Sequence, residues 1–353
     1  MQPRSRLSLC LLLTTATLGA SAAAASAQEV APLDAAAVTA PAREAAKAPS
    51  AERLPGLGGT DRRPSEIALR LKGLRHGKLP VGHKVVVAGT LRPFVRGQRV
   101  TVTLRRGKHT LKRRTVRVHA KRRKGSNLGK FSLSERLVRP GRYSAQAVHR
   151  RNAQLGGSRD STRNFHIRYP DLRQGASGDA VKLLNGLLAR QGYVNDEGRN
   201  FNSATGRAVL AFRKVNGMAR KSSATGSIFK TLAKGKGGFK LEHPGAGHHV
   251  EADLSRQVMV LAKGRKVDEI YAISSGAPAT PTILGKFHFY RKEPGTNSHG
   301  MVNSVYFIRG YATHGYAPVP TYPASHGCLR NPIPDSRHIY DWIDLGDPIY
   351  VYR

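Results

Sequence analysis

Short apolar runs, separated by glycine and proline, recur through residues 64–168 of this 353-residue chain. They include residues 85–87, 100–104, 116–118 and 143–147, and the turn residues between them include Pro80, Gly89, Gly97, Gly107, Gly129 and Pro140. Short runs with regular turn signals are typical of strands in a β-sandwich. The pattern therefore predicts that the first folded domain, residues 64–168, is a β-sandwich.

The same segment is very basic, most visibly at residues 112–114 and 121–124. The whole chain carries 59 Lys+Arg against 22 Asp+Glu, a formal net charge of +37, and such a surface attracts anions. The run Gly141-Arg142-Tyr143 resembles bacterial immunoglobulin-like domains, which implies an immunoglobulin-like sandwich. Two interpretations of the charge stay open: a solvated hairpin, or attachment to teichoic acid, lipid headgroups or similar polyanions.

Helical spacing replaces the strand pattern in residues 169–237. The apolar residues of a first helix are Val181, Leu184, Leu187 and Leu188, and Ser177 or Asp179 can cap its start. Apolar stripes within residues 204–215 and 228–232 predict a second and a third helix. We therefore expect a small three-helix bundle between two β-rich regions.

This helical segment resembles the small peptidoglycan-binding domain that accompanies cell-wall enzymes. The resemblance rests on residues 172–181, Leu184, Leu188, Gly192-Tyr193 and residues 208–212. It implies that the segment binds glycan. The turn at residues 195–201 departs from the usual glycine- and aspartate-rich form, so a spacer bundle without a ligand is the alternative.

From His248 to Arg353 the chain returns to strand patterns. Strand-like runs lie at residues 250–254, 257–261, 269–273, 287–290 and 349–352, and one helix is indicated at about residues 335–343. This region is predicted to be a β-rich domain, residues 248–353. The chain as a whole is therefore expected to be multidomain and mainly β.

The N-terminus has the features of an export signal. Arg4 and Arg6 precede an apolar stretch, residues 7–18, and Ala25-Ser26-Ala27 offers a cleavage site. The stretch is too short to span a bilayer comfortably, so residues 1–27 are predicted to be a signal peptide, with an uncleaved anchor as the alternative. Residues 28–63, rich in Ala and Pro, are predicted to be a disordered linker. We expect an exported protein of the cell wall or periplasm.

The chain contains two cysteines, and cleavage after Ala27 removes Cys10 and leaves Cys328. Cys328 directly follows His326-Gly327, and His314 lies upstream. Acyl transfer by cysteine needs a thiolate, a base that generates it, and donors for the oxyanion. The histidines supply a base and the backbone near Gly327 supplies amides, so the pattern predicts nucleophilic catalysis at Cys328.

Residues 324–330, together with His314-Gly315 and Gly310-Tyr311-Ala312, strongly resemble the L,D-transpeptidase catalytic domain, the YkuD-like domain. Further matching segments are residues 253–257, 274–276, 280–282, 285–287, 340–342 and 346–351. The resemblance covers residues 248–353. It implies a cysteine acyltransferase that crosslinks peptidoglycan.

By this resemblance the motif residues take roles. Cys328 is the nucleophile, His314 is the general base with its ring oriented by a backbone carbonyl, and His326 orients the loop or the substrate. Amides of Gly327 and Cys328 form the oxyanion hole, with Tyr306 or Tyr311 as further donors. The substrate-binding candidates are Arg330, Tyr306, Tyr311 and Ser325, of which Arg330 pairs with a carboxylate or braces the loop and Ser325 bonds locally.

The resemblance implies a two-step reaction on a tetrapeptide stem. Cys328 attacks the carbonyl of the third residue and expels D-Ala, and an amine from another stem or a wall protein then takes the acyl group. Water as the acceptor would make the enzyme an L,D-carboxypeptidase. The reaction needs no cofactor and no metal, and the expected partners are stem peptides and glycan, with the enzyme acting as a monomer.

Three other classes stay open. His314, His326 and Cys328 are all zinc-ligand types and could form a metal site. A non-catalytic wall-adhesion protein would use the domain for binding alone. Net charge favours a nucleic-acid binder, but the signal peptide and the lack of a recognisable reading motif oppose it, so no nucleic-acid partner is expected.

Overall fold

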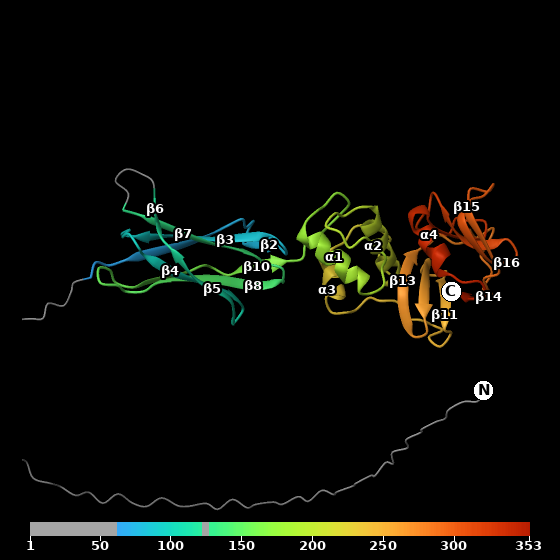
Figure 1. Cartoon of the computed structure of the whole chain (residues 1–353), viewed down its shortest axis with the longest axis horizontal. Helices are drawn as coiled ribbons and strands as arrows, with labels where there is room; N and C mark the ends of the chain where they lie inside the picture. Colours follow the sequence, from blue (N-terminus) through green and yellow to red (C-terminus); the bar gives the residue numbers. More distant parts are fainter. Residues whose placement is uncertain (1–61, 122–126) are drawn as a thin grey trace, which may run out of the picture. The chain divides into compact units, whose positions relative to one another are not determined.

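The computed structural model describes residues 62–121 and 127–353, shown as ribbons in Figure 1. The predicted signal peptide, all but the last two residues of the predicted linker, and Arg122, Arg123 and Lys124 of the second basic run lie outside the described residues. Within the described ranges, no helix has the length and apolar character needed to cross a bilayer.

The first domain contains two β-sheets in its described part. One has the strand order β1-β3-β7-β6, with β1 (Glu66–Lys72), β3 (Lys84–Arg92), β7 (Gly129–Arg136) and β6 (His119–Ala120). The other has the order β2-β10-β8-β4-β5, with β9 beside β8. Its strands are β2 (Lys78–Pro80), β10 (Phe165–Arg168), β8 (Gly141–His149), β4 (Arg99–Arg106), β5 (His109–Arg117) and β9 (Ser158–Ser161).

The two sheets bury one apolar core between them. Alternate residues of β3 and β4 point inward, among them Val85, Val87, Val100 and Val102, and all four are almost fully buried. The intervening residues face outward because successive side chains of a strand lie on opposite faces. The prediction of a mainly β chain is confirmed, whereas the immunoglobulin-like topology stays a prediction.

The middle region contains helices α1 (Asp179–Ala189), α2 (Ser203–Val215) and α3 (Gly226–Leu232), drawn in yellow-green in Figure 1. The prediction that Ser177 or Asp179 caps the first helix is wrong, because the N-cap residue is Gly178 and no side chain caps it. The Asp179 carboxylate instead pairs with Arg136 and Arg199. Helix α2 does have a side-chain cap, since Asn202 accepts a hydrogen bond from the backbone N–H of Thr205.

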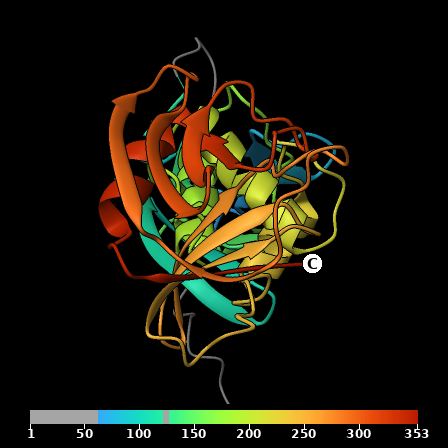
Figure 2. The ribbon, with the colours of Figure 1, turned by 90° about the vertical axis from the view of Figure 1, so that its right-hand side faces the viewer.

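The C-terminal domain, which faces the viewer in Figure 2, pairs two further sheets. One has the order β13-β12-β11-β19-β14, with β13 (Lys266–Ala272), β12 (Val258–Lys263), β11 (His248–Asp253), β19 (Pro348–Tyr352) and β14 (Gly285–His288). The other has the order β15-β16-β17-β18, with β15 (Arg291–Thr296), β16 (Val302–Ile308), β17 (Tyr311–Tyr316) and β18 (Leu329–Pro332). Helix α4 (Ile333–Trp342) follows β18 directly and packs on β16 and β17.

Strand β12 is buried on both faces, which explains why its sequence is continuously apolar. Met259 and Leu261 belong to the core between the two C-terminal sheets. Val258, Val260 and Ala262 belong to the core that the three helices form. The helices therefore cover the outer face of the five-stranded sheet with a shared apolar core.

Candidate active site

His314 lies on strand β17, and Cys328 lies in the turn that directly precedes the neighbouring strand β18. Strands β17 and β18 run parallel, and their register pairs His314 with Arg330 and Thr313 with Leu329. Thr313 and Leu329 are fully buried, and Leu329 belongs to the core between the sheets. Because side chains alternate along a strand, His314 and Arg330 lie on the sheet face opposite that core. Cys328 directly precedes β18.

The His314 ring is held in one tautomer. Its Nδ1 lies 3.0 Å from the carbonyl oxygen of Gly315, which can only accept, so Nδ1 carries the proton and donates it. Nε2 of the neutral ring then keeps a lone pair that can accept a proton. Burial lowers the pKa of His314 below its ordinary value of 6.5, and the positive charge of Arg330 acts in the same direction.

The Cys328 thiol lies beside the start of β17, with Sγ 3.7 Å from the carbonyl oxygen of Gly310. Burial raises the pKa of this thiol above its ordinary value, although the Ala312 N–H and the Arg330 charge lower it in part. With a raised thiol pKa and a lowered imidazole pKa, both groups rest in their neutral forms at pH 7. Both shifts favour the neutral thiol and the neutral imidazole.

A serine hydroxyl fixes the turn that carries the cysteine. Ser325 Oγ donates to the carbonyl oxygen of Cys328 at 2.5 Å and accepts from the N–H of Gly327 at 3.1 Å. Ser325 is buried, so its hydroxyl braces the loop internally. Both hydrogen bonds of the Ser325 hydroxyl therefore stabilise the turn itself.

Gly327 is required by two features of this turn. Its φ is +111°, a backbone conformation that other residues rarely adopt. A Cβ at this position would also lie 2.1 Å from the Tyr311 ring. The Tyr311 ring thus packs on the bare face of Gly327.

Two of the predicted oxyanion donors already make hydrogen bonds within the protein, and one does not. The N–H of Gly327 already donates to Ser325, so its predicted oxyanion role is not supported by this arrangement. The Tyr306 hydroxyl donates its hydrogen to Glu293 at 2.6 Å, so it too already has an acceptor. The N–H of Cys328 has no acceptor among the described residues, and it is therefore the candidate donor for an oxyanion.

A second loop holds the cysteine turn from the other side, and its role was not predicted. Thr282 Oγ1 donates to the carbonyl oxygen of Gly327 at 2.7 Å and accepts from the N–H of Gly276 at 2.9 Å. Thr280 Oγ1 donates to the carbonyl oxygen of Ser325 at 2.9 Å. The signal in the sequence is Thr280-Pro281-Thr282, one of the segments that resemble the catalytic domain, for which no contact with the cysteine turn was predicted.

The other predicted site residues have different environments. The Arg330 guanidinium lies 4.3 Å from the centre of the Tyr316 ring, a cation–π arrangement that directs it along the sheet face. His326 is exposed. It is therefore free to meet a ligand, although no contact assigns it an orienting role.

The zinc alternative finds no support in the positions of the three residues. In the part of the chain that the structure describes, one trio of potential ligands has its atoms within 4.8 Å of one another, and it is His248, Asp344 and Asp347. His314, His326 and Cys328 do not form such a group. A tetrahedral metal needs its ligand atoms to converge, so these residues are better suited to acyl transfer.

Comparison with known proteins agrees with this chemistry. Residues 247–351 match the family model described as the L,D-transpeptidase catalytic domain, YkuD. No curated protein matches the chain at a significant level.

Solved structures of L,D-transpeptidases are similar to parts of the chain. One from Xylanimonas cellulosilytica is 28% identical and covers 52% of this chain and 98% of its own, with a TM-score of 0.49. The catalytic domain from E. faecium is 27% identical over 30% of this chain and 98% of its own, with a TM-score of 0.27. One from Stackebrandtia nassauensis is 21% identical over 52% of this chain and 95% of its own, with a TM-score of 0.33.

Proposed function

Residues 247–351 belong to the YkuD family of L,D-transpeptidase catalytic domains, and from that premise we propose that this protein is an exported cysteine acyltransferase that remodels peptidoglycan. The observation that carries the proposal is the parallel pairing of β17 and β18, which brings the tautomer-fixed His314 close to the turn that holds the Cys328 thiol. Such a pair supplies a nucleophile and its base without a metal ion.

The first step transfers an acyl group to the enzyme. Cys328 Sγ bonds to the carbonyl carbon of the third stem residue while the thiol proton moves to His314 Nε2. The carbonyl oxygen becomes an oxyanion, for which the N–H of Cys328 is the free donor. The bond to D-Ala then breaks, and the leaving amine takes the proton from His314.

The second step releases the acyl group. An acceptor amine attacks the thioester and gives a proton to His314, which returns it to the departing sulfur. The product is a new amide, and the thiol is restored. Water in place of the amine would give a carboxylic acid and an L,D-carboxypeptidase.

The test follows both protein and products by mass spectrometry. Purified protein and a Cys328→Ala variant are incubated with a disaccharide tetrapeptide. We expect an acyl adduct on Cys328, release of D-Ala and a 3→3 linked dimer, all missing from the variant. Release of D-Ala without a dimer would favour the carboxypeptidase. Folded protein with a free thiol but no adduct and no D-Ala would reject the donor assignment and favour the adhesion protein.

Export, a monomeric state and glycan binding by the helical region are separate parts of the proposal. Residues 1–27 have the composition of a signal peptide, so protein recovered outside the cytoplasm should begin at Gln28. N-terminal sequencing of that protein tests this expectation. A start at Met1 would instead indicate an uncleaved anchor. Light scattering tests the monomer, and pull-down with purified peptidoglycan tests the helices.

A further inference from the structure

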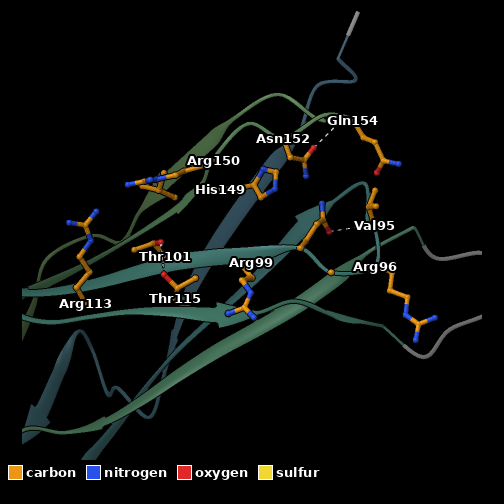
Figure 3. A pocket seen from close by; sticks show the side chains of 13 residues that line it. Val95, Arg96, Arg99, Thr101, Arg113, Thr115, His149, Arg150, Asn152 and Gln154 are labelled. Atoms are coloured by element: carbon orange, nitrogen blue, oxygen red, sulfur yellow. Dashed lines mark hydrogen bonds between the residues drawn. The ribbon is translucent and has the colours of Figure 1, made fainter. Parts of the chain in front are cut away.

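The N-terminal sandwich contains a groove that the catalytic chemistry does not use. It has a volume of about 840 Å³ and lies between the turn after β3 and the loop after β8, over the outer faces of β4 and β5 (Figure 3). Thr101 and Thr115 pair across its floor, with their hydroxyl oxygens 3.0 Å apart. The floor of the groove therefore contains two hydroxyl groups, beside the apolar side chain of Val148.

Four arginines surround this floor. They are Arg96, Arg99, Arg113 and Arg150, all of them exposed, and Figure 3 shows them on several sides of the groove. None of the lining residues is acidic, and none of the four arginines has a carboxylate within ion-pair distance among the described residues. Guanidinium groups without a carboxylate partner, placed around one groove, favour the binding of an anion.

Both walls of the groove are held in place before any ligand binds. Asn152 Oδ1 accepts from the N–H groups of Gln154 and Leu155 at 3.0 and 2.8 Å, which orders the loop after β8. The buried Gln98 accepts from the N–H of Val95 at 2.9 Å and donates to the carbonyl oxygen of Pro93 at 3.1 Å. Prior order of this kind reduces the entropy that a ligand must overcome.

The positive charge continues beyond the groove. Residues 64–168 contain 28 lysines and arginines and three acidic residues. Two of those three are engaged, because Glu135 pairs with Lys112 and Asp160 accepts from the N–H of Leu69. Arg117 and Arg159 lie on exposed positions of β5 and β9 in the same sheet. A ligand longer than the groove would meet further cations along this face.

We propose that the groove binds a linear polyphosphodiester of the cell wall, a chain of phosphates joined by sugars or polyols without bases. Guanidinium groups match the geometry of phosphate oxygens, and the surrounding charge suits a repeating polyanion. No Phe, Tyr or Trp lines the groove, whereas proteins that hold single-stranded nucleic acid use aromatic rings to stack bases. The choice of a wall polymer rests on the proposed function, but the anion site itself does not.

Two variants with equal charge test the proposal. In the groove variant, Arg96, Arg99, Arg113 and Arg150 are each replaced by Gln. In the control variant, Arg70, Lys72, Lys121 and Lys130 are replaced by Gln, because these four line a different hollow, on the sheet that contains β1 and β3. Both variants lose four positive charges from the same domain. A difference between their affinities therefore distinguishes binding in the groove from non-specific attraction by the charge of the domain.

Binding of a poly(glycerol phosphate) oligomer is measured by calorimetry at several salt concentrations. We expect the groove variant to lose about 30-fold or more in affinity and most of its salt dependence, and the control to lose about threefold, since each phosphate contact releases counterions. Equal losses of affinity in the two variants would contradict the proposal that the oligomer binds in the groove. Tighter binding of a single-stranded DNA oligomer would replace the wall polymer with nucleic acid.

The readout stays separate from catalysis. Cys328→Ala should bind the oligomer like the unaltered protein, and the groove variant should release D-Ala from a soluble tetrapeptide at the normal rate. If the unaltered protein binds the oligomer but releases no D-Ala, the proposed function is contradicted and the proposed binding site in the groove still holds. Loss of D-Ala release in the groove variant, with its fold preserved, would contradict an independent site.

Discussion

At the scale of single residues, burial sets the chemistry of the thiol and its base. The carbonyl oxygen of Gly315 fixes Nδ1 of His314 as the donor, and burial keeps the ring neutral. Burial also keeps Cys328 a thiol. Because the neutral form of each group is favoured, the thiol must lose its proton before or while the carbon–sulfur bond forms.

The acid limb of the activity should reflect the lowered pKa of His314. A base with a pKa below 6.5 is more than half unprotonated at pH 6.5, so the midpoint of the fall in kcat/KM for D-Ala release should lie below pH 6.5. The Arg330 charge contributes to the lowered pKa, so Arg330→Gln should move the limb to higher pH. A pH profile of kcat/KM for both proteins measures this. A limb centred above pH 6.5 in the unaltered protein would contradict it.

Gly327 should tolerate no side chain. An added Cβ would lie 2.1 Å from the Tyr311 ring, at a residue whose φ is already positive, so the turn would have to move. Displacements of about 1 Å at a reacting group can cost about 100-fold in rate. We therefore expect Gly327→Ala to lose D-Ala release by about that factor while far-ultraviolet circular dichroism stays normal. Gly310→Ala is the matched control, since no atom lies within 4 Å of its Cβ position. Similar rates in both variants would reject the argument.

At the scale of elements, the cysteine turn depends on a loop distant in the chain. The Thr282 hydroxyl links the N–H of Gly276 to the carbonyl oxygen of Gly327, and Ser274 and Arg330 exchange backbone hydrogen bonds. The loop after β13 therefore positions the turn before β18. Neither segment forms this geometry alone.

Thr282→Val should weaken the link without changing the volume of the side chain. The buried N–H of Gly276 and the carbonyl oxygen of Gly327 each lose a partner, and an unsatisfied buried group costs about 1–3 kcal/mol. Denaturant unfolding should show a loss of that order together with slower acylation. Thr296→Val, at an exposed position of β15, should change the free energy of unfolding by less than about 0.5 kcal/mol. Equal effects of the two substitutions would contradict the link.

The sequence predicted some elements well and missed others for physical reasons. Residues 258–261 are apolar because all of them are buried, residues 349–352 alternate between buried and partly buried side chains, and both strands were predicted. Strand β15, Arg291–Thr296, was missed because it is a polar edge strand with Pro294 and Gly295 in it. Strands β17 and β18 were missed because His, Gly, Arg and Asn at the site interrupt their apolar pattern. The sequence motif predicted cysteine chemistry. Only the parallel pairing of β17 and β18 shows that His314 and Arg330 lie on the same face of the sheet.

At the scale of the whole molecule, the helices and the five-stranded sheet share one apolar core within the described residues. Val258 and Val260 lie in the helical core, and Arg207 of α2 makes a bidentate ion pair with Asp335 of α4, at 2.7 and 2.9 Å. Removing the helices would expose an apolar sheet face to water. The boundary between residues 169–237 and 248–353 stays a prediction, and the two regions share an apolar interface.

Because of Lys214, the stability of this interface should depend on pH. The side chain comes from α2, is almost fully buried, and donates from Nζ to the carbonyl oxygens of Gln257 at 3.0 Å and Ile273 at 2.7 Å. Burial lowers its pKa to about 7, and the nearby Arg220 charge adds to this. Between pH 7 and the ordinary lysine value of 10.5, the unfolded chain therefore binds a proton that the folded chain does not.

Stability should consequently rise with pH across that window, because the cost of deprotonating Lys214 on folding decreases as the pH approaches 10.5. Lys214→Met keeps the length of the side chain and removes the titrating group. The free energy of unfolding, measured with denaturant at pH 7, 8, 9 and 10, should increase more in the unaltered protein than in Lys214→Met. The difference between the two proteins removes the contribution of tyrosines and other groups that titrate in both. Parallel profiles would mean that Lys214 keeps its ordinary pKa, and that the interface holds a charged lysine on two carbonyl oxygens.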